Sequence, residues 1–228
     1  EADVALAGGA DAPVFPMTFA CLDKAGLASR RNHGTVPAGP FDRRCDTGVI
    51  SEGAGVVVLE SLEHARARGA QPYLEISGYG SLRDPDAEHL ADGLAGAIQT
   101  ALGDAGRSPG DIDYISAHGP GHPALDKAET LVIKRIFGRR AYQVPVSSIK
   151  GVIGNPLAAA GVLQLIACAC SLREGLIPPT AGLEQPHPEC DLDFVPGAAR
   201  AYRARCMLLN SHGLGGGNGS MVVERVEA

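Results

Sequence analysis

The segment 114–122 places a histidine where a strand-like run gives way to glycines. It reads Tyr-Ile-Ser-Ala-His-Gly-Pro-Gly-His, so apolar residues lead directly to His118 and Gly119. Glycine lacks a Cβ and lets the backbone approach a ligand closely, and imidazole can donate or accept a proton near neutral pH. The run predicts either an imidazole displayed in an active site or a histidine that only ties down its own loop.

Two further apolar runs also end in polar residues. One leads to Ser147-Ser-Ile-Lys150 and then Gly151-Val-Ile-Gly-Asn155, and the other is Asn210-Ser-His-Gly-Leu-Gly-Gly-Gly-Asn218. Taken singly, Lys150 could be a solvated lysine and the glycine run a flexible loop. Ligands of open α/β sheets bind outside the carboxyl ends of the strands, so the three strand ends together predict one cleft.

The elements that must position these residues alternate between strand and helix, a rhythm that predicts a parallel sheet. The run 56–60 is continuously apolar, which is typical of a strand buried on both faces, and 4–7 is expected to be a buried strand. A loop rich in Pro, Gly and Arg is expected over 30–44. The expected strands are 4–7, 56–60, 73–79, 112–116, 144–148, 206–210 and 221–225, and the expected helices are 15–25, 62–68, 90–105, 124–137 and 156–173.

Composition narrows the class of protein. With 228 residues, 45% apolar and 20% charged, the chain resembles an ordinary globular α/β protein. Its formal charge of −6 argues against binding to a nucleic-acid backbone. The longest apolar stretch, 157–172, contains Gln164 and falls short of the ~20 residues of a membrane span. The 6 scattered cysteines predict reduced thiols in a cytoplasmic protein without a metal site.

The opening residues bear on completeness. The sequence starts Glu1-Ala-Asp-Val-Ala-Leu-Ala, so a strand-like run stands at its very beginning. We therefore expect a fragment, or the downstream piece of a split polypeptide, whose first strand needs partners outside these residues.

The motifs taken together resemble a known family. Their types and order are similar to the C-terminal portion of a β-ketoacyl-acyl carrier protein synthase, of the thiolase-fold condensing enzymes. The resemblance covers essentially the whole chain. The segments that carry it are Glu52–Glu60, His118-Gly119, Asp126–Glu129, Ser147–Lys150, Gly154, Ala158–Gly161, Ile177–Thr180, Cys190–Val195 and Asn210–Ser220.

The resemblance implies a fold and a reaction. The fold is a layered αβαβα arrangement, with residues 1–70 a remnant of the N-terminal half and its cap loop, and 71–228 the C-terminal half. The reaction is a decarboxylative Claisen condensation of an acyl thioester with malonyl-acyl carrier protein, in fatty acid or polyketide synthesis.

The resemblance also implies which partners the chain needs and which catalytic residue it lacks. The acyl carrier protein brings its 4'-phosphopantetheine arm as part of the substrate, so no bound cofactor or metal is expected. The other partners are the missing N-terminal half and a second subunit, in a homodimer or a ketosynthase heterodimer. The family's nucleophilic cysteine lies in the missing half, so this chain alone is expected to be inactive.

By family position, His118 donates a hydrogen bond to the malonyl thioester oxygen as negative charge develops there. Lys150 pairs with Glu129 in a buried network beside it, although Glu129 could also simply place charge in the first turn of a helix. The backbone N–H of Leu214 matches the oxyanion donor, and Gly213 and Gly215 belong to a mobile glycine-rich gate.

Three departures from the family pattern alter the expected site. Asn155 stands where the elongating branch carries a second histidine; it either completes a Cys-His-Asn set or caps a helix that begins at Pro156. Pro120 and His122 occupy the region where threonines usually hold the pantetheine arm. In the gate, His212 and Leu214 replace an aromatic pair.

Two other classes of protein remain as alternatives. A non-catalytic partner resembling a chain-length factor would explain the departures, but the joint presence of His118, Lys150 and Glu129 favours a catalytic synthase. A thiolase is less consistent with the sequence, because the late Cys-x-Gly pattern of thiolases is replaced here by Ser211-His-Gly213.

Overall fold

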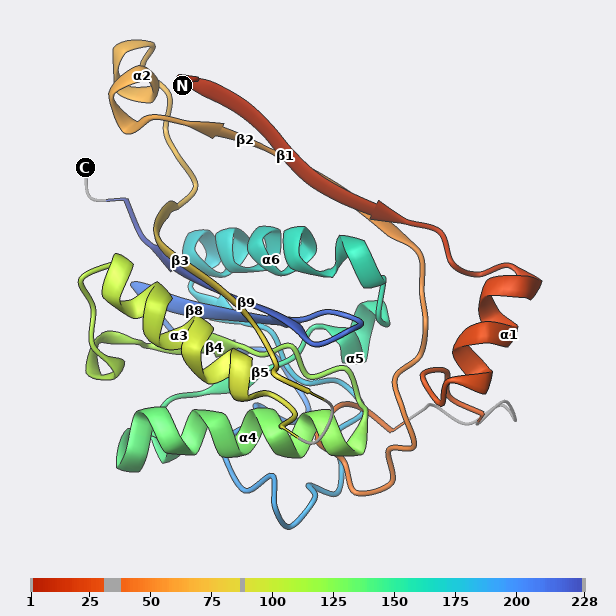
Figure 1. Cartoon of the computed structure of the whole chain (residues 1–228). Coiled ribbons are helices and arrows are strands. Elements are labelled where there is room, and N and C mark those ends of the chain that lie inside the picture. The colour runs from red at the N-terminus through yellow and green to blue at the C-terminus, as the bar shows by residue number, and fades with distance from the viewer. Residues whose placement is uncertain (1, 31–37, 87–88, 227–228) are drawn as a thin grey trace.

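A mixed five-stranded sheet forms the centre of the molecule. The computed structural model describes residues 2–30, 38–86 and 89–226, and Figure 1 shows the arrangement of the elements. The strands in spatial order are β3 (Glu75–Arg83), β9 (Gly217–Glu224), β8 (Cys206–His212), β4 (Tyr114–Ser116) and β5 (Val146–Ser147).

The directions of these strands show that the predicted parallel sheet is only part of a mixed sheet. Strand β4 runs parallel to both β5 and β8, but β9 is antiparallel to β8 and to β3. The reversal follows from the short glycine-rich turn between β8 and β9, since a hairpin joins antiparallel strands whereas parallel strands need a longer crossover. The parallel part of the sheet still places the carboxyl ends of β4, β5 and β8 at one edge.

Helices cover both faces of the sheet (Figure 1). The amphipathic helices α3 (Asp92–Asp104) and α4 (Pro123–Phe137) pack on one face, where their apolar residues join the largest core cluster. Helix α6 (Ala160–Glu174) lies on the other face, with Leu165, Cys168 and Leu172 in a second cluster. The shorter elements are α5 (Lys150–Ile153), the 3-10 turns Pro109–Asp111, Gly138–Tyr142 and Leu157–Ala159, and the strand pair β6 (Leu176–Ile177) and β7 (Arg200–Ala201).

The stretch Leu157–Glu174 is the one segment of the described chain with the length and apolar composition of a membrane-crossing helix. Its 3-10 turn and α6 pack between the sheet and a strand pair, as the central helix of a globular protein does. The expected helix start at Pro156 is wrong, because Leu157 has a φ of +44° and the α-helix begins only at Ala160.

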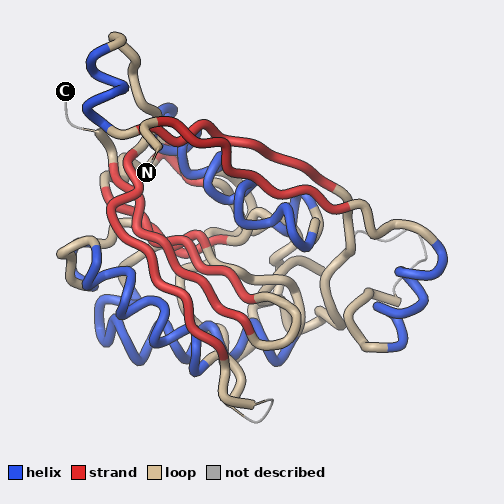
Figure 2. The backbone as a smooth tube through the Cα atoms, turned by 45° about the horizontal axis from the view of Figure 1, so that its top comes forward, coloured by secondary structure: helices blue, strands red, loops and turns tan. Residues whose placement is uncertain are grey.

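An antiparallel pair of strands lies over α6 on the side away from the central sheet (Figures 1 and 2). We call β1 (Val4–Asp11) and β2 (Gly53–Glu60) the ribbon. Its inner face contacts α6 and the turn before it. Its outer face is apolar yet exposed, with Leu6 at 75% and Val58 at 59% of their full accessible areas. The expectation that 56–60 is buried on both faces is therefore wrong for the described chain, in which no element covers the outer face.

The two helices beside the ribbon lie where the sequence predicts them. Helix α1 (Pro16–Lys24) follows β1, and α2 (Leu62–Ala67) follows β2. Ser61 caps α2 by accepting a hydrogen bond from the His64 N–H at 3.2 Å. The predicted loop 30–44 lies partly outside the described residues, at 31–37, and its described part contains no helix.

Candidate active site

The backbone of His118 is held by the carboxylate of Glu129. The His118 N–H donates to Oε1 at 2.9 Å and the Gly119 N–H donates to Oε2 at 2.8 Å. Glu129 comes from the middle of α4 and is buried. Two backbone donors on one carboxylate are strong, charge-assisted bonds, so the point where β4 ends is fixed relative to α4.

Lys150 binds the same residue from the other side. Its Nζ donates to the His118 carbonyl oxygen at 2.5 Å. Lys150 and Glu129, expected to pair in a buried network, make no direct ion pair in the described chain; they bind the carbonyl and the N–H of His118, and their charges still interact. Burial lowers the pKa of Lys150 to about 8, although the charges of Glu129 and Asp126 act in the opposite direction.

The ring of His118 is oriented by a hydrogen bond from the end of strand β8. The backbone N–H of His212, at the end of β8, donates to His118 Nδ1 at 3.2 Å. Because Nδ1 is an acceptor, the proton of the neutral ring lies on Nε2. Burial, and then the charge of Lys150, hold the pKa of His118 well below its usual range. The ring therefore offers an N–H donor at Nε2 at neutral pH.

Further polar side chains support this frame, and sequence motifs do not predict which partners they bind. Asn210 Nδ2 donates to Glu129 Oε1 at 3.1 Å, and Ser220 Oγ donates to Asn210 Oδ1 at 3.1 Å. Gln164 of α6 donates to the Ala117 carbonyl at 3.0 Å. The only available signal was the presence of Asn210 and Gln164 within otherwise apolar runs, since a buried polar side chain needs a partner.

Phe41 packs against the loop that carries His118 and Gly119. Its N–H donates to Asp126 Oδ2 at 2.7 Å, and its ring stacks on Phe194 with centroids 3.8 Å apart. A Cβ added to Gly119 would come within 2.9 Å of the Phe41 ring, so only glycine fits there. Burial raises the pKa of Asp126 to about 7, against the effect of its backbone donors.

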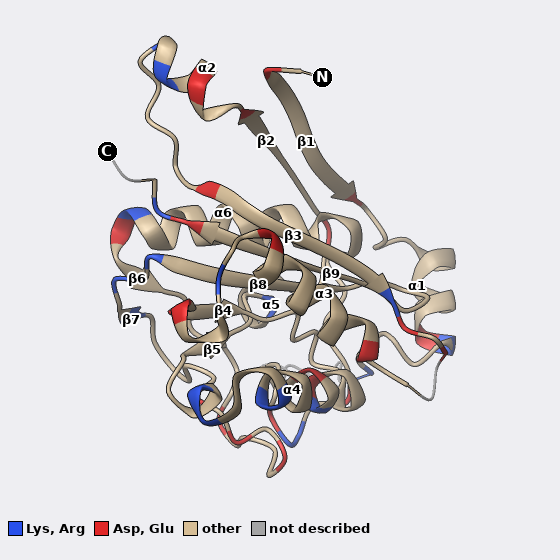
Figure 3. Ribbon diagram, turned by 60° about the vertical axis from the view of Figure 1, so that its left-hand side comes forward, with Lys and Arg blue, Asp and Glu red and all other residues tan. Residues whose placement is uncertain are grey.

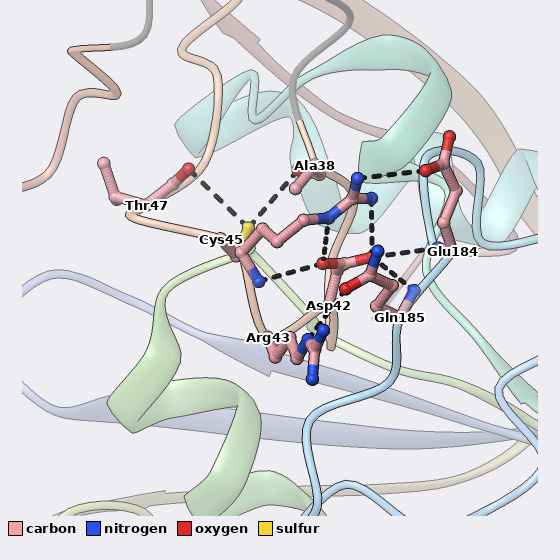
Figure 4. A network of polar contacts seen from close by, with 8 residues as sticks. Ala38, Asp42, Arg43, Cys45, Thr47, Glu184 and Gln185 are labelled. Atoms are coloured by element: carbon pink, nitrogen blue, oxygen red, sulfur yellow. Dashed lines mark hydrogen bonds and ion pairs between the residues drawn. The ribbon is translucent and has the colours of Figure 1, made fainter.

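The loop that carries Phe41 is anchored by Asp42 (Figure 4). The Asp42 carboxylate accepts hydrogen bonds from the Arg44 guanidinium at 2.9 Å and from the Gln185 N–H at 2.7 Å. Burial alone would raise the pKa of Asp42, but bonds from Arg44 and from backbone N–H groups hold it well below its usual range. The carboxylate therefore ties residues 38–47 to the turn at 184–185.

The glycine-rich turn between β8 and β9 begins beside His118. The Gly213 N–H donates to the Gly217 carbonyl at 2.6 Å, and Gly215 and Gly216 have φ values of +86° and +81°. Leu214 is 67% exposed at the tip. Its backbone N–H makes no hydrogen bond within the described chain, so it can donate to a ligand.

The remaining predicted residues lie close to this loop. Pro120 is buried, and its carbonyl oxygen would be 2.0 Å from a Cβ added to Gly48. The Asn155 Cβ is also near Gly48, at 4.0 Å from that added atom. His122 precedes α4, its Nδ1 is buried without a hydrogen-bond partner, and burial lowers its pKa.

The interpretation of Asn155 as a helix cap is wrong. The residue at the cap position of the 3-10 turn is Pro156, and no side-chain cap bond is formed there. Instead the Asn155 N–H donates to the Val49 carbonyl at 2.7 Å. The backbone of Asn155 therefore pairs with the strand-like segment 49–51. Its amide side chain makes no hydrogen bond within the described chain.

The cysteines are free thiols in the described chain. Cys45 is near the loop, since its Sγ would lie 3.1 Å from a Cβ added to Gly121, and its thiol donates to the Ala38 carbonyl at 3.3 Å (Figure 4). Burial raises the pKa of both Cys168 and Cys206 to about 12. A thiol with a raised pKa is a poor nucleophile at neutral pH.

A separate cavity of about 240 Å³ lies between the ribbon, α6 and the sheet. Its lining is mainly apolar and includes Val57, Leu165, Leu209 and Met221. The charged groups of the His118 site do not line it, but Gln164 and Asn210, which support that site, do. Figure 3 shows Lys, Arg, Asp and Glu interspersed around α4 and nearby loops, while the ribbon is uncharged along most of its length.

Family models match most of the chain in two parts. Residues 1–65 match the model described as beta-ketoacyl synthase, N-terminal domain, and residues 73–184 match beta-ketoacyl synthase, C-terminal domain. The order of the two matches along the chain agrees with the resemblance found in the motifs.

Curated relatives agree. The tetracenomycin polyketide synthase ketoacyl synthase alpha subunit of Streptomyces glaucescens is 44% identical over 99% of this chain and 54% of its own length. The 3-oxoacyl-[acyl-carrier-protein] synthase 2 of Coxiella burnetii is 40% identical over 99% of this chain and 56% of its own length. The chain thus spans about half the length of the curated relatives it matches.

A solved structure has the same fold. The ketosynthase in a type II PKS complex with its acyl-carrier protein, bound to a hexaketide (AntDE:AntF), superposes with a TM-score of 0.94. It is 35% identical and covers 99% of this chain and 57% of that chain. With its thiolase-like fold and these matches, the chain belongs to the beta-ketoacyl synthase family.

Proposed function

We propose that the protein takes part in decarboxylative condensation, joining an acyl thioester to the two-carbon unit of a malonyl thioester carried on an acyl carrier protein. The observation that carries the proposal is the state of His118. Its backbone is fixed by Glu129 and Lys150, and its ring is oriented by the His212 N–H so that Nε2 bears the proton.

Decarboxylation needs a fixed donor of this kind. The bond between C2 and the carboxylate of the malonyl group breaks, its electron pair passes to C2, and CO2 leaves. Negative charge then develops on the thioester oxygen, which accepts the hydrogen bond from His118 Nε2. A preorganised donor at the place where charge develops is the usual way in which an enzyme lowers such a barrier.

Condensation completes the reaction. The C2 carbanion attacks the carbonyl of an acyl group held on a cysteine, and the thiolate leaves. The backbone N–H of Leu214 donates to the oxyanion of the tetrahedral intermediate, and the amide of Asn155 provides a second donor to the malonyl oxygen. Lys150 adds positive charge beside His118. The nucleophilic thiol comes from outside these residues, and this chain alone is inactive.

The partners follow from this reaction. An acyl carrier protein delivers the substrate on its pantetheine arm, no further cofactor is required, and a second ketosynthase subunit completes the assembly. Pro120 has no N–H donor, so hydrogen bonds to the arm come from other residues near His122. One relative is named as a polyketide synthase subunit and another as a 3-oxoacyl-[acyl-carrier-protein] synthase, so their names support either polyketide or fatty acid synthesis.

A second candidate function is a non-catalytic partner subunit that shapes the acyl channel of a heterodimer. Asn155 in place of a second histidine and Pro120 in place of a hydroxyl donor favour it. The intact polar frame around His118 favours the catalytic role, because a non-catalytic subunit does not require a buried lysine and a buried glutamate that both bind one histidine.

The test is the decarboxylation of a malonyl thioester by the intact protein, a step that does not require the nucleophilic thiol. We expect His118→Ala to lower the rate about 100-fold or more. His89→Ala, a change at an exposed histidine, should leave the rate unchanged. A wild-type rate equal to that of His118→Ala would reject the catalytic role and favour the partner subunit.

A further inference from the structure

His212 stands at the junction of β8 with the glycine-rich turn, and its side chain is only 11% exposed. Its ring centroid lies 5.9 Å from that of His118, at an interplanar angle of 58°. The proposed function uses only its backbone N–H. The surroundings of its imidazole indicate that the side chain also acts on His118.

The proton position on His212 follows from its neighbour Asn218. The Asn218 amide nitrogen donates to Asp84 Oδ1 at 2.9 Å and to the Gly216 carbonyl at 3.0 Å. The amide orientation is therefore set by two acceptors, and Oδ1 of Asn218 is left as an acceptor. His212 Nδ1 lies 2.8 Å from this oxygen and must carry the proton.

The carboxylate of Asp84 anchors this chain of bonds to the body of the protein. Its Oδ1 also accepts the N–H of Gly93 at the start of α3, at 2.8 Å. The Asp84 N–H donates to the Gly216 carbonyl at 2.8 Å. Its Oδ2 is buried without a hydrogen-bond partner and lies 3.8 Å from His212 Nδ1. The imidazole of His212 is thus held through Nδ1 by Asn218 and, through Asn218, by Asp84.

The two histidines consequently have opposite proton positions. His118 accepts at Nδ1 and donates at Nε2, whereas His212 donates at Nδ1. If the His212 side chain is not held, its backbone N–H can leave Nδ1 of His118. The proton of His118 can then move to Nδ1, and the donor at Nε2 is lost.

We propose that the His212 side chain is a positioning residue for His118. By donating to Asn218, which is held by Asp84, it keeps its own backbone N–H on His118 Nδ1 while the glycine-rich turn next to it moves. The inference rests on the proposed function, because the purpose of the arrangement is to keep Nε2 of His118 as the donor to the substrate.

Three substitutions in the intact protein separate the possible roles of the ring. His212→Asn keeps a donor near the position of Nδ1, His212→Gln places its amide farther out, near the position of Nε2, and His212→Phe keeps a ring without a donor. We expect Phe and Gln to lower kcat for malonyl thioester decarboxylation about 10–100-fold, the range seen when supporting partners of a catalytic group are removed. KM should change less than about 2-fold, and Asn should restore most of kcat.

A second measurement does not depend on activity. The ¹⁵N chemical shifts of the His118 ring distinguish a protonated Nε2 from a protonated Nδ1. We expect the wild type and His212→Asn to show the Nε2 proton alone, and His212→Phe to show shifts averaged between the two forms. The Asn and Gln variants are close in size, so their comparison decides even if the Phe variant does not fold.

The outcomes are distinguishable. Unchanged His118 shifts and kcat in His212→Gln and His212→Phe would overturn the proposal. Restoration by Gln and not by Asn would also overturn it, because the ring would then act through Nε2 on the substrate. If wild type and His118→Ala decarboxylate equally slowly, the proposed function fails, and the ring shifts still decide the positioning role.

Discussion

His118 is held by separate partners for its backbone and its ring. Glu129 and Lys150 bind the backbone N–H and carbonyl, and the His212 N–H binds the ring. Glu129 binds two N–H groups with bond lengths of 2.9 and 2.8 Å, so it holds the loop regardless of which side chain stands at 118. Substitutions at 118 therefore change the chemistry of the site without removing its support.

Lys150→Met tests the buried ammonium, since methionine has a similar length and no donor. In the folded protein the pKa of Lys150 is about 8, against an ordinary value of 10.5. Between these two values the unfolded chain binds more protons than the folded chain, so this residue makes stability rise with pH. We expect the free energy of unfolding of wild type to increase relative to Lys150→Met from about pH 8 to 10.5, measured by denaturant titration at each pH.

The same substitution removes the donor to the His118 carbonyl. Malonyl decarboxylation at pH 7 should fall about 10–100-fold, as for other supporting partners of a catalytic group. Lys24→Met, at the exposed end of α1, is the matched control and should change neither quantity. A stability difference that stays flat with pH would contradict the buried, charged state assigned to Lys150.

Among the secondary-structure elements, the helices were predictable from the sequence and the details of the strands were not. The apolar stripe of α3 and the proline at the first position of α4 are local signals, and both helices lie within two residues of the predicted bounds. Strand β5 is shorter than the expected 144–148 because Pro145 cannot donate to the ladder. The extension of β3 to Arg83 depends on its pairing with β9, at residues distant in sequence.

The same distinction applies to the site. His118, Glu129 and Lys150 could be chosen from sequence because each stands in a motif, and the structure brings them together. The roles of Asp42, Asp84 and Asn218 could not be predicted. Each depends on partners more than 100 residues away or on the orientation of an amide, such as the bond from Gln185 to Asp42 or from Asn218 to Asp84.

Gly48→Ala tests how closely the segment before β2 must approach the histidine loop. An added Cβ would lie 2.0 Å from the Pro120 carbonyl oxygen, so one of the two backbones must move. We expect a loss of about 1–3 kcal/mol in the free energy of unfolding, together with slower malonyl decarboxylation. Gly103→Ala, in α3 with no atom near the added Cβ, should instead be stabilising, because alanine is the better helix former. Equal effects of the two changes on stability would contradict the close contact.

The exposed ribbon is the feature that most affects the behaviour of the chain in solution. Val56 is 66% exposed, and Leu6 is paired directly with Val58 on the same outer face. A contiguous apolar strand surface promotes association between copies of a chain. The sheet and helices beneath the ribbon have their own buried apolar cores, so copies of the chain can associate without unfolding.

We therefore expect the 228-residue chain to self-associate through the ribbon. The double substitution Leu6→Lys and Val58→Glu places charge on the outer face and should shift the chain toward monomer in sedimentation velocity at micromolar concentration. Leu131→Lys, at a single exposed leucine on α4, is the control and should leave the distribution unchanged. Monomeric behaviour of the unmodified chain would contradict the expectation.

The carboxylate of Glu129 has one more consequence, for how such a site can change over evolutionary time. Because it binds residues 118 and 119 through their main-chain N–H groups, which every amino acid except proline provides, the residue at position 118 can be exchanged without first rebuilding the loop. A lineage could lose the imidazole, keep a folded subunit, and later regain the reaction by a single codon change.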